Sequence, residues 1–386
     1  MEFDFGWILL GLPVAFALGW LASRLDLRQL RIENHQAPKA YFRGLSHLLN
    51  EQQDQAIDAF IEAVQKDPDT SELHFALGNL FRRRGEYERA VRVHEHLLSR
   101  ADLGKHDRER AQYALAQDFL KAGLLDRAEE ALHKLEHTHY QEQAWLTLLA
   151  LHERSRDWTR ATQVARHLQQ AGQGDFSGRL AHYLCEQADQ ALHKKHDAAG
   201  ARQLLEQTIT DTPDAARPRI QLAGLLAAEG DTAGAFHRLA ELESKAPHAL
   251  PLVASELVRL GKDCARLDAA YELLERCYVR APSVDVADAL VQAQVARGTP
   301  IVQARSGYVR HMAQEPSLIA ASRWLSHEQF ASDVVHATVQ QSIEHATHPL
   351  ARYRCAACGF EAQGYFWQCP GCLAWESFPP RRIEEL

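Results

Sequence analysis

Four cysteines near the C-terminus have the residue type and the spacing of a metal site. They form two Cys-x-x-Cys pairs, Cys355 with Cys358 and Cys369 with Cys372, and ten residues separate the pairs. Thiolates are soft ligands, and two such pairs facing each other present four sulfurs in the tetrahedral arrangement that suits Zn²⁺ or a single iron ion. We therefore predict that these four cysteines bind one ion, iron or zinc.

The alternative for the same cysteines is two disulfides, and the compartment decides between them. From Phe5 to Ser23 the chain carries no charged residue, a run of 19 that is long enough to span a bilayer as a helix. Directly after it come Arg24, Arg28 and Arg31. Because positive charge stays on the cytoplasmic side, we expect residues 1–23 to be a single-pass anchor with a periplasmic N-terminus. The rest of the chain then lies in the reducing cytosol, where thiolates stay free for metal.

A stripe of small residues runs along the predicted anchor: Gly11, Ala15 and Gly19 recur every four residues. Such a stripe lets another membrane helix approach closely, so helix pairing is one interpretation of it. Small residues are also common in membrane helices, and chance is the other interpretation.

The elements that must position the cysteines show an internal period near 34 residues. One column of the repeat is alanine: Ala56, Ala90, Ala128, Ala161, Ala201, Ala235, Ala270, Ala304 and Ala337. Twelve residues after it, six of the nine repeats have proline: Pro68, Pro213, Pro247, Pro282, Pro316 and Pro349. Small residues precede the alanine by twelve (Gly44, Gly78, Ala116 and Ala223), and glycines precede it by five (Gly85, Gly123 and Gly230).

These columns have a joint physical meaning. Two antiparallel helices pack closely where both carry small residues, a glycine ends the first helix, and a proline stops the second. The pattern resembles tetratricopeptide repeats over residues 37–349. We predict an all-α, right-handed superhelical solenoid of about nine repeats, with the transmembrane helix before it and a small rubredoxin-like metal knuckle after it. Leu149, Asp189 and Val258 stand where a small residue is usual, so repeats four, five and seven are degenerate.

Resemblance to the repeat family implies which residues line the concave groove. The first three repeats place Tyr41, Phe75 and Tyr113 there, an aromatic row suited to binding a peptide. The other interpretation is that these rings pack between helices, and the sequence leaves both open.

The predicted domain order is therefore an anchor (1–23), a juxtamembrane segment (24–36), the solenoid (37–349) and the metal-binding domain (350–386). Only Pro349 to Arg354 separates the last repeat from Cys355. A tether this short predicts that the knuckle docks against the end of the solenoid and covers exposed apolar helix there.

The composition argues against several classes of function. The net charge of −8 gives no basic footprint for nucleic acid. The 21 histidines are scattered without ligand spacing and are expected on helix surfaces. Gly172, Gly174 and Gly178 are one residue out of register for a dinucleotide loop, and no strand precedes them. We find no catalytic constellation and predict that the chain is not an enzyme.

The order of parts, together with the segment "YRCAACGFEAQGYFWQCPGCLAWESF", resembles the lipopolysaccharide assembly protein B family of Gram-negative bacteria. The resemblance implies an inner-membrane adaptor that brings the deacetylase of the lipid A pathway to the membrane protease FtsH. It also implies docking of other inner-membrane lipopolysaccharide assembly or regulatory proteins. Two alternatives remain: an assembly scaffold without a proteolytic role, and a rubredoxin-type electron carrier. Whether the chain forms a homodimer stays open.

Overall fold

The computed structural model describes residues 16–17, 20, 39–328 and 333–386 of the chain. The chain forms two compact units, one ending at Leu151 and one running from His152 to Leu386. The stripe Gly11, Ala15 and Gly19 and almost all of the predicted anchor lie outside the described residues. In the described part of the chain, no helix is both long and apolar enough to cross a membrane.

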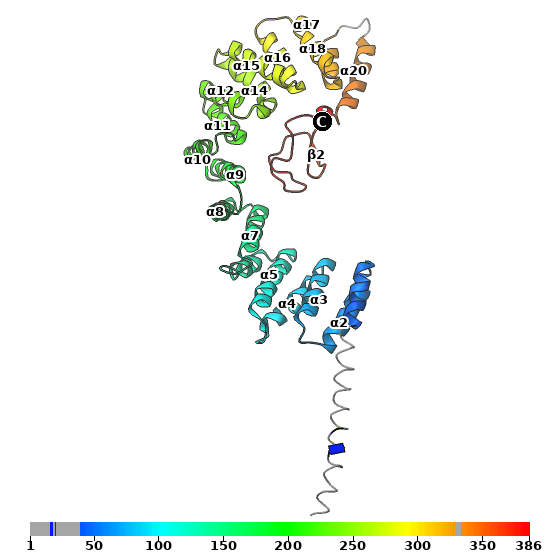
Figure 1. The fold of residues 1–386 in the computed structure, drawn as a ribbon. Coiled ribbons are helices and arrows are strands. Elements are labelled where there is room, and N and C mark those ends of the chain that lie inside the picture. Colours follow the sequence, from blue (N-terminus) through cyan, green and yellow to red (C-terminus); the bar gives the residue numbers. More distant parts are fainter. Residues whose placement is uncertain (1–15, 18–19, 21–38, 329–332) are drawn as a thin grey trace, which may run out of the picture. The chain divides into compact units, whose positions relative to one another are not determined.

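The first unit is built from antiparallel helix pairs (Figure 1). Helical residues 39–49 precede α2 (Gln53–Lys66), α3 (Ser71–Arg84), α4 (Tyr87–Ser99), α5 (Lys105–Lys121), α6 (Leu125–His133) and α7 (Gln141–Ser155), which crosses into the second unit.

Glycine ends the first helix of a pair, as the sequence predicts. Gly85 directly follows α3 and has a φ of 85°, a left-handed conformation in which glycine meets no Cβ penalty. Its N–H donates to the carbonyl oxygens of Arg82 and Phe81, which closes the helix before α4 begins at Tyr87.

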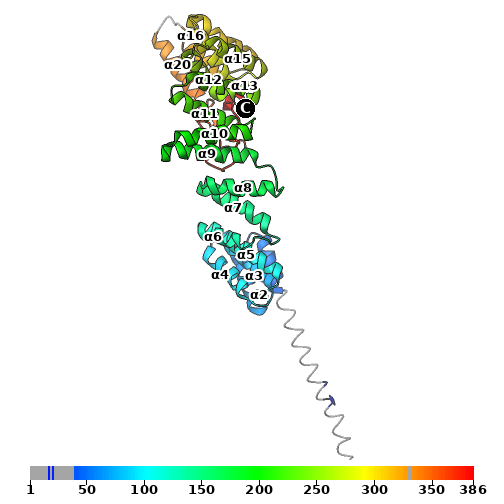
Figure 2. The same cartoon turned by 90° about the vertical axis from the view of Figure 1, so that its left-hand side faces the viewer.

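The second unit continues the pairs and carries the knuckle. Its helices are α8 (Trp158–Gln170), α9 (Ser177–Lys195), α10 (Ala198–Asp211), α11 (Ala216–Ala228), α12 (Thr232–Ala240), α13 (Leu242–Lys245), η1 (Pro247–Val253), α14 (Ala254–Asp263), α15 (Leu267–Arg280), α16 (Val284–Ala296), α17 (Ile301–Ala304), α18 (Ser306–Gln314), α19 (Leu318–Leu325) and α20 (Asp333–Thr347). Figure 2 shows α9, α10 and α11 stacked as successive layers of this unit. The strands β1 (Tyr353–Arg354) and β2 (Glu361–Ala362) and the short helix η2 (Ile383–Glu385) follow.

The proline column marks helix ends, as predicted. Each of the six prolines stands two residues after the last residue of a helix, namely α2, α10, α13, α15, α18 and α20. Proline has no backbone N–H and disfavours helical geometry in the residue before it. The first five therefore separate one helix pair from the next, and Pro349 separates α20 from the ribbon.

The alanine column marks the contact between paired helices. Eight of its nine members are at most 1% exposed, from Ala56 to Ala304. The ninth prediction is wrong, because Ala337 on α20 is exposed. Nearby, Val334 is 77% exposed, so α20 ends the stack with an uncovered apolar face.

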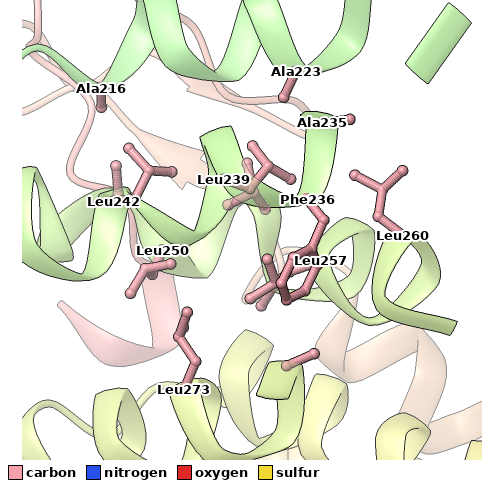
Figure 3. Packing of buried hydrophobic residues seen from close by; sticks show 14 of the residues in the cluster. Ala216, Ala223, Ala235, Phe236, Leu239, Leu242, Leu250, Leu257, Leu260 and Leu273 are labelled. Atoms are coloured by element: carbon pink, nitrogen blue, oxygen red, sulfur yellow. The ribbon is translucent and has the colours of Figure 1, made fainter. Parts of the chain in front are cut away.

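Packing in the second unit is continuous across several repeats. Figure 3 shows side chains from successive helices converging in its core, among them Ala223 of α11, Phe236 of α12, Leu257 of α14 and Leu273 of α15. Each of these residues is at most 4% exposed. This core includes α9 and α16, two of the helices that the knuckle contacts.

Candidate metal centre and its docking surface

Short backbone hydrogen bonds fold the C-terminal ribbon, residues 353–378, around its cysteines. β1 pairs antiparallel with β2, which places Cys355 at the start of a tight turn. The N–H of Cys355 donates to the carbonyl of Phe360, and the N–H of Gly359 donates back to Cys355. The second turn repeats this arrangement, with the N–H of Cys369 donating to Ala374.

The four sulfurs form a compact cluster. All lie within 4.8 Å of one another. The Sγ atoms of Cys355 and Cys372 are 3.8 Å apart, and those of Cys358 and Cys369 are 3.7 Å apart. A tetrahedral site with metal–sulfur bonds of about 2.3 Å has sulfur–sulfur edges of about 3.8 Å, so the cluster has the size of a site for one ion. A disulfide needs about 2.05 Å, and all four thiols are free.

The environment of Cys355 favours the thiolate that a metal requires. Burial disfavours the charged form, but hydrogen bonds from Ser377 and from the backbone N–H groups of Cys358 and Ala357 outweigh it and lower the pKa of Cys355 to about 6. The spacing of the four sulfurs allows the cluster to hold a metal. Both zinc and iron accept four sulfurs in this geometry, so the two ions remain equal predictions.

An aromatic cluster fixes the ribbon on the helices of the second unit. The ring of Trp375 stacks on His182 of α9, with centroids 4.7 Å apart. Its edges meet Trp158 and Tyr183 in T-shaped contacts, both at 5.9 Å. Its indole Nε1 donates to Glu153 Oε1 at 3.0 Å, so the polar group of the ring is satisfied.

His182 is the buried polar member of this interface. It is 3% exposed, and its Nε2 lies 3.1 Å from Glu376 Oε1 of the ribbon. Desolvation lowers the pKa of His182, while the hydrogen bond to Glu376 opposes that shift. The same hydrogen bond to His182 lowers the pKa of Glu376.

The tail after the ribbon holds two more helices by their first turns. Arg382 makes a bidentate pair with Asp285 of α16, at 2.8 and 3.0 Å. Glu385 accepts the N–H of Val284 at 2.7 Å, and Glu384 accepts the N–H groups of Leu318 and Ile319. Carboxylates at helix N-termini satisfy free N–H groups and suit the positive end of the helix dipole.

These contacts correct the expected docking site. The knuckle does reach the end of the solenoid at α19, but it also extends back to α7, α8 and α9, and Figure 1 shows it on the inner side of the curve of these helices within the second unit. We expected the knuckle to cover exposed apolar side chains of the last solenoid helix. This expectation is wrong, because Val334 and Val335 of α20 are 77% and 53% exposed. No local sequence signal links Glu153 or His182 to Trp375, so sequence reasoning missed this surface.

The predicted groove residues take different positions in the first unit. Phe75 is 1% exposed and lies under the guanidinium of Arg110, 4.0 Å from the ring centroid, so it packs between helices. Tyr41 is half-buried against Phe60, and half-buried Tyr113 stacks on Tyr140 at 5.5 Å. A groove role therefore stays a prediction for the two tyrosines and is corrected for Phe75.

The expectation that the histidines lie on helix surfaces is wrong for five of them. His74, His94, His152, His182 and His311 are at most 4% exposed. His94 is held by Asp118, at 2.5 Å from Nδ1 to Oδ2, and Asp118 also accepts from Arg82 at 2.9 Å. A buried carboxylate without a partner is costly, and Arg82 and His94 supply the partners of Asp118.

The fold and the site define a protein of tetratricopeptide-like helix pairs with a four-cysteine ribbon that can hold a metal. The model of a family described as "Rubredoxin metal binding domain" matches residues 353–380, and a tetratricopeptide-repeat model matches residues 43–94.

Relatives extend the similarity to the whole chain. Lipopolysaccharide assembly protein B of Escherichia coli K12 is 29% identical, with 96% of this chain and 97% of the relative covered. The Haemophilus influenzae protein of the same name is 27% identical, with 97% and 98% covered. The predicted resemblance to this family is confirmed. Among solved structures, "Structure of Naa15/Naa10 bound to HypK-THB" aligns with 82% of this chain and 48% of that one, at 16% identity and a TM-score of 0.40.

Proposed function

We propose that this chain acts in lipopolysaccharide assembly as an inner-membrane adaptor that presents the deacetylase of the lipid A pathway to the protease FtsH. The observation that carries the proposal is the whole-length similarity to proteins named for lipopolysaccharide assembly, which includes both the repeats and the ribbon. Stacked helix pairs suit binding of partner proteins, and the site has the features of a structural metal centre.

Residues 1–23 supply the membrane attachment in this proposal, with the N-terminus in the periplasm. An adaptor held at the membrane raises the local concentration of a soluble client near a membrane-bound protease without any new contact between the two. The stripe Gly11, Ala15 and Gly19 is the proposed surface for another membrane helix.

The four cysteines have a structural role in this proposal. One iron or zinc ion on Cys355, Cys358, Cys369 and Cys372 supplies the cohesion that a ribbon of this size lacks. Two of these sulfurs are buried, those of Cys355 and Cys369, and the ribbon is tied to the solenoid by the contacts of Trp375 and Arg382. We propose no catalytic role.

The test is the half-life of the deacetylase in cells that lack this chain, complemented by the full chain or by a chain without residues 1–23. The full chain should shorten the half-life, and the truncated chain should fold but leave the half-life long. Equal half-lives in all three strains would contradict the adaptor and favour the assembly scaffold, which binds lipopolysaccharide enzymes without changing their turnover. A reversible visible spectrum on reduction, with electron transfer to a partner, would favour the electron carrier.

A further inference from the structure

Two adjoining cavities lie beside the docked ribbon in the second unit. The first, of about 460 Å³, lies between the last turns of α8 and α10 and the first turns of α9. The second, of about 330 Å³, is bordered by the start of α9, the segment 211–218 and Glu376 of the ribbon. They share four lining residues, Ser177, Ala181, Asp211 and Thr212, so they form one elongated cleft.

The cleft has an apolar floor and a polar rim. Ala181 and Leu184 on the floor are buried, and Leu180 is half-buried. Arg166, Gln169 and Gln170 stand exposed on the rim of the first cavity. Apolar pockets with a few placed polar groups are typical of binding sites.

The second cavity has an excess of negative charge. Asp211 and Asp214 line it, are exposed, and have no ion-pair partner among the described residues. Glu376 is a third carboxylate on its wall, and its hydrogen bond to His182 lowers the pKa of Glu376. The charge of Arg217 is already matched by Glu186, at 2.7 Å.

A second, independent feature of the same cavity is a buried arginine with hydrogen-bond donors that are unpaired in the described part of the chain. Arg217 lines it and is 6% exposed, and its Nε and Nη1 have no hydrogen-bond partner among the described residues. Buried donors without acceptors are costly, and a bound carbonyl oxygen would satisfy them. A peptide that carries a basic side chain supplies both the carbonyl oxygens and the positive charge.

We propose that this cleft binds an extended segment of a client protein that places a lysine or arginine against Asp211 and Asp214. The inference rests on the adaptor function proposed above and locates its client site. Because Glu376 belongs to the ribbon, the second cavity is complete only when the ribbon is docked.

The test is binding of a degenerate nonapeptide library to the purified full-length, metal-loaded protein, with residue enrichment read at each position of the retained peptides. We expect Lys and Arg to be enriched, and the double variant Asp211→Asn/Asp214→Asn to lower that enrichment about two- to fivefold per carboxylate. Glu376→Gln should lower it in the same direction. The matched control is Asp268→Asn/Glu272→Gln on α15, which removes the same charge away from the cleft.

A retained pool without preference for Lys or Arg would overturn the proposal, and so would equal enrichment in the cleft variant and the wild type. Thermal unfolding checks that each variant is folded. The deacetylase half-life separates the two proposals. If that half-life depends on the chain while the library shows no basic preference, only the cleft is refuted. If the preference is present and the half-life is unaffected, only the adaptor function is refuted.

Discussion

The helix pairs of the first unit and those around the ribbon differ in which residues pack between their helices. In α3 and α4 the packing is local, because Gly78 leaves room for the ring of His94, which Asp118 of the next pair holds. Around α9, where Asp189 stands in place of the usual small residue, His182 and Tyr183 pack on Trp375 of the C-terminal ribbon. The comparison teaches that regular repeats pack on each other, whereas degenerate ones here depend on residues from the C-terminus.

The largest effect should come from removing two ligands. We expect Cys355→Ser/Cys358→Ser to abolish metal binding, unfold the ribbon and lower the free energy of unfolding of the second unit by several kcal/mol, because metal-binding free energy is folding free energy in so small a unit. Metal analysis and thermal unfolding measure both effects.

The matched control is Cys264→Ser, a half-buried free thiol outside the ribbon, which should cost at most about 1 kcal/mol. A double variant that loses its metal and keeps full thermal stability would show that the ribbon does not brace the degenerate repeats, and the comparison would fail.

The next effect tests the interface without touching the metal. Trp375→Ala removes the ring between His182, Trp158 and Tyr183 and leaves Glu153 without its indole donor. We expect the free energy of unfolding of the second unit to fall by about 3–5 kcal/mol. Relative to the wild type, hydrogen exchange should become faster in α9 and stay unchanged in α3.

Trp375→Phe keeps most of the apolar area and loses only the hydrogen bond, so it should cost less than the alanine variant. If both variants exchange at the wild-type rate in α9, the aromatic cluster does not transmit stability from the ribbon to the helices.

A smaller effect is expected in the first unit. A Cβ at position 78 would lie 2.5 Å from Cε1 of His94, a ring that Asp118 holds in place. Gly78→Ala should therefore destabilise the first unit by about 1–3 kcal/mol through overpacking. Gly224→Ala, on α11, is the control: nothing lies within 4 Å of its added Cβ. It should stabilise by about 0.5–1 kcal/mol, and equal melting temperatures for both variants would argue against close local packing in α3 and α4.

Periodicity made most of the fold predictable from the sequence. Helix-ending prolines and glycines and the buried alanines follow from local steric rules, so their positions from Ala56 to Ala304 could be read directly. The exception, Ala337, lies on α20, which no further helix pair follows in the described part of the chain. The repeat period predicts that each helix pair packs on another, but it does not predict which pair is the last.

The four cysteines could be predicted because their spacing is local, whereas the docking surface could not. Trp375 and Glu153 are 222 residues apart, and neither belongs to a periodic column. The buried histidines were missed for a related reason: His94 occupies space that Gly78 leaves on another helix, and a scattered histidine carries no such signal in its own segment.

The smallest effect concerns pH and His182, the buried histidine of the ribbon interface. Desolvation depresses the pKa of His182 below the ordinary 6.5, against the opposing charges of Glu376 and Glu186 and with support from Arg217. A depressed folded-state pKa means that the unfolded chain binds the proton more tightly, so this contribution to stability is complete above pH 6.5 and is lost as the pH falls below that value.

We therefore expect the melting temperature of the wild type to fall more between about pH 7.5 and pH 5.5 than that of His182→Gln, which cannot take up the proton. The difference between the two proteins isolates His182, because His74 and His311, whose pKa values burial also lowers, are present in both. Parallel melting curves would mean that the ribbon interface is insensitive to this proton. The contact of His182 with Glu376 would then differ from that of His94 with Asp118 only in the sequence separation of the two partners.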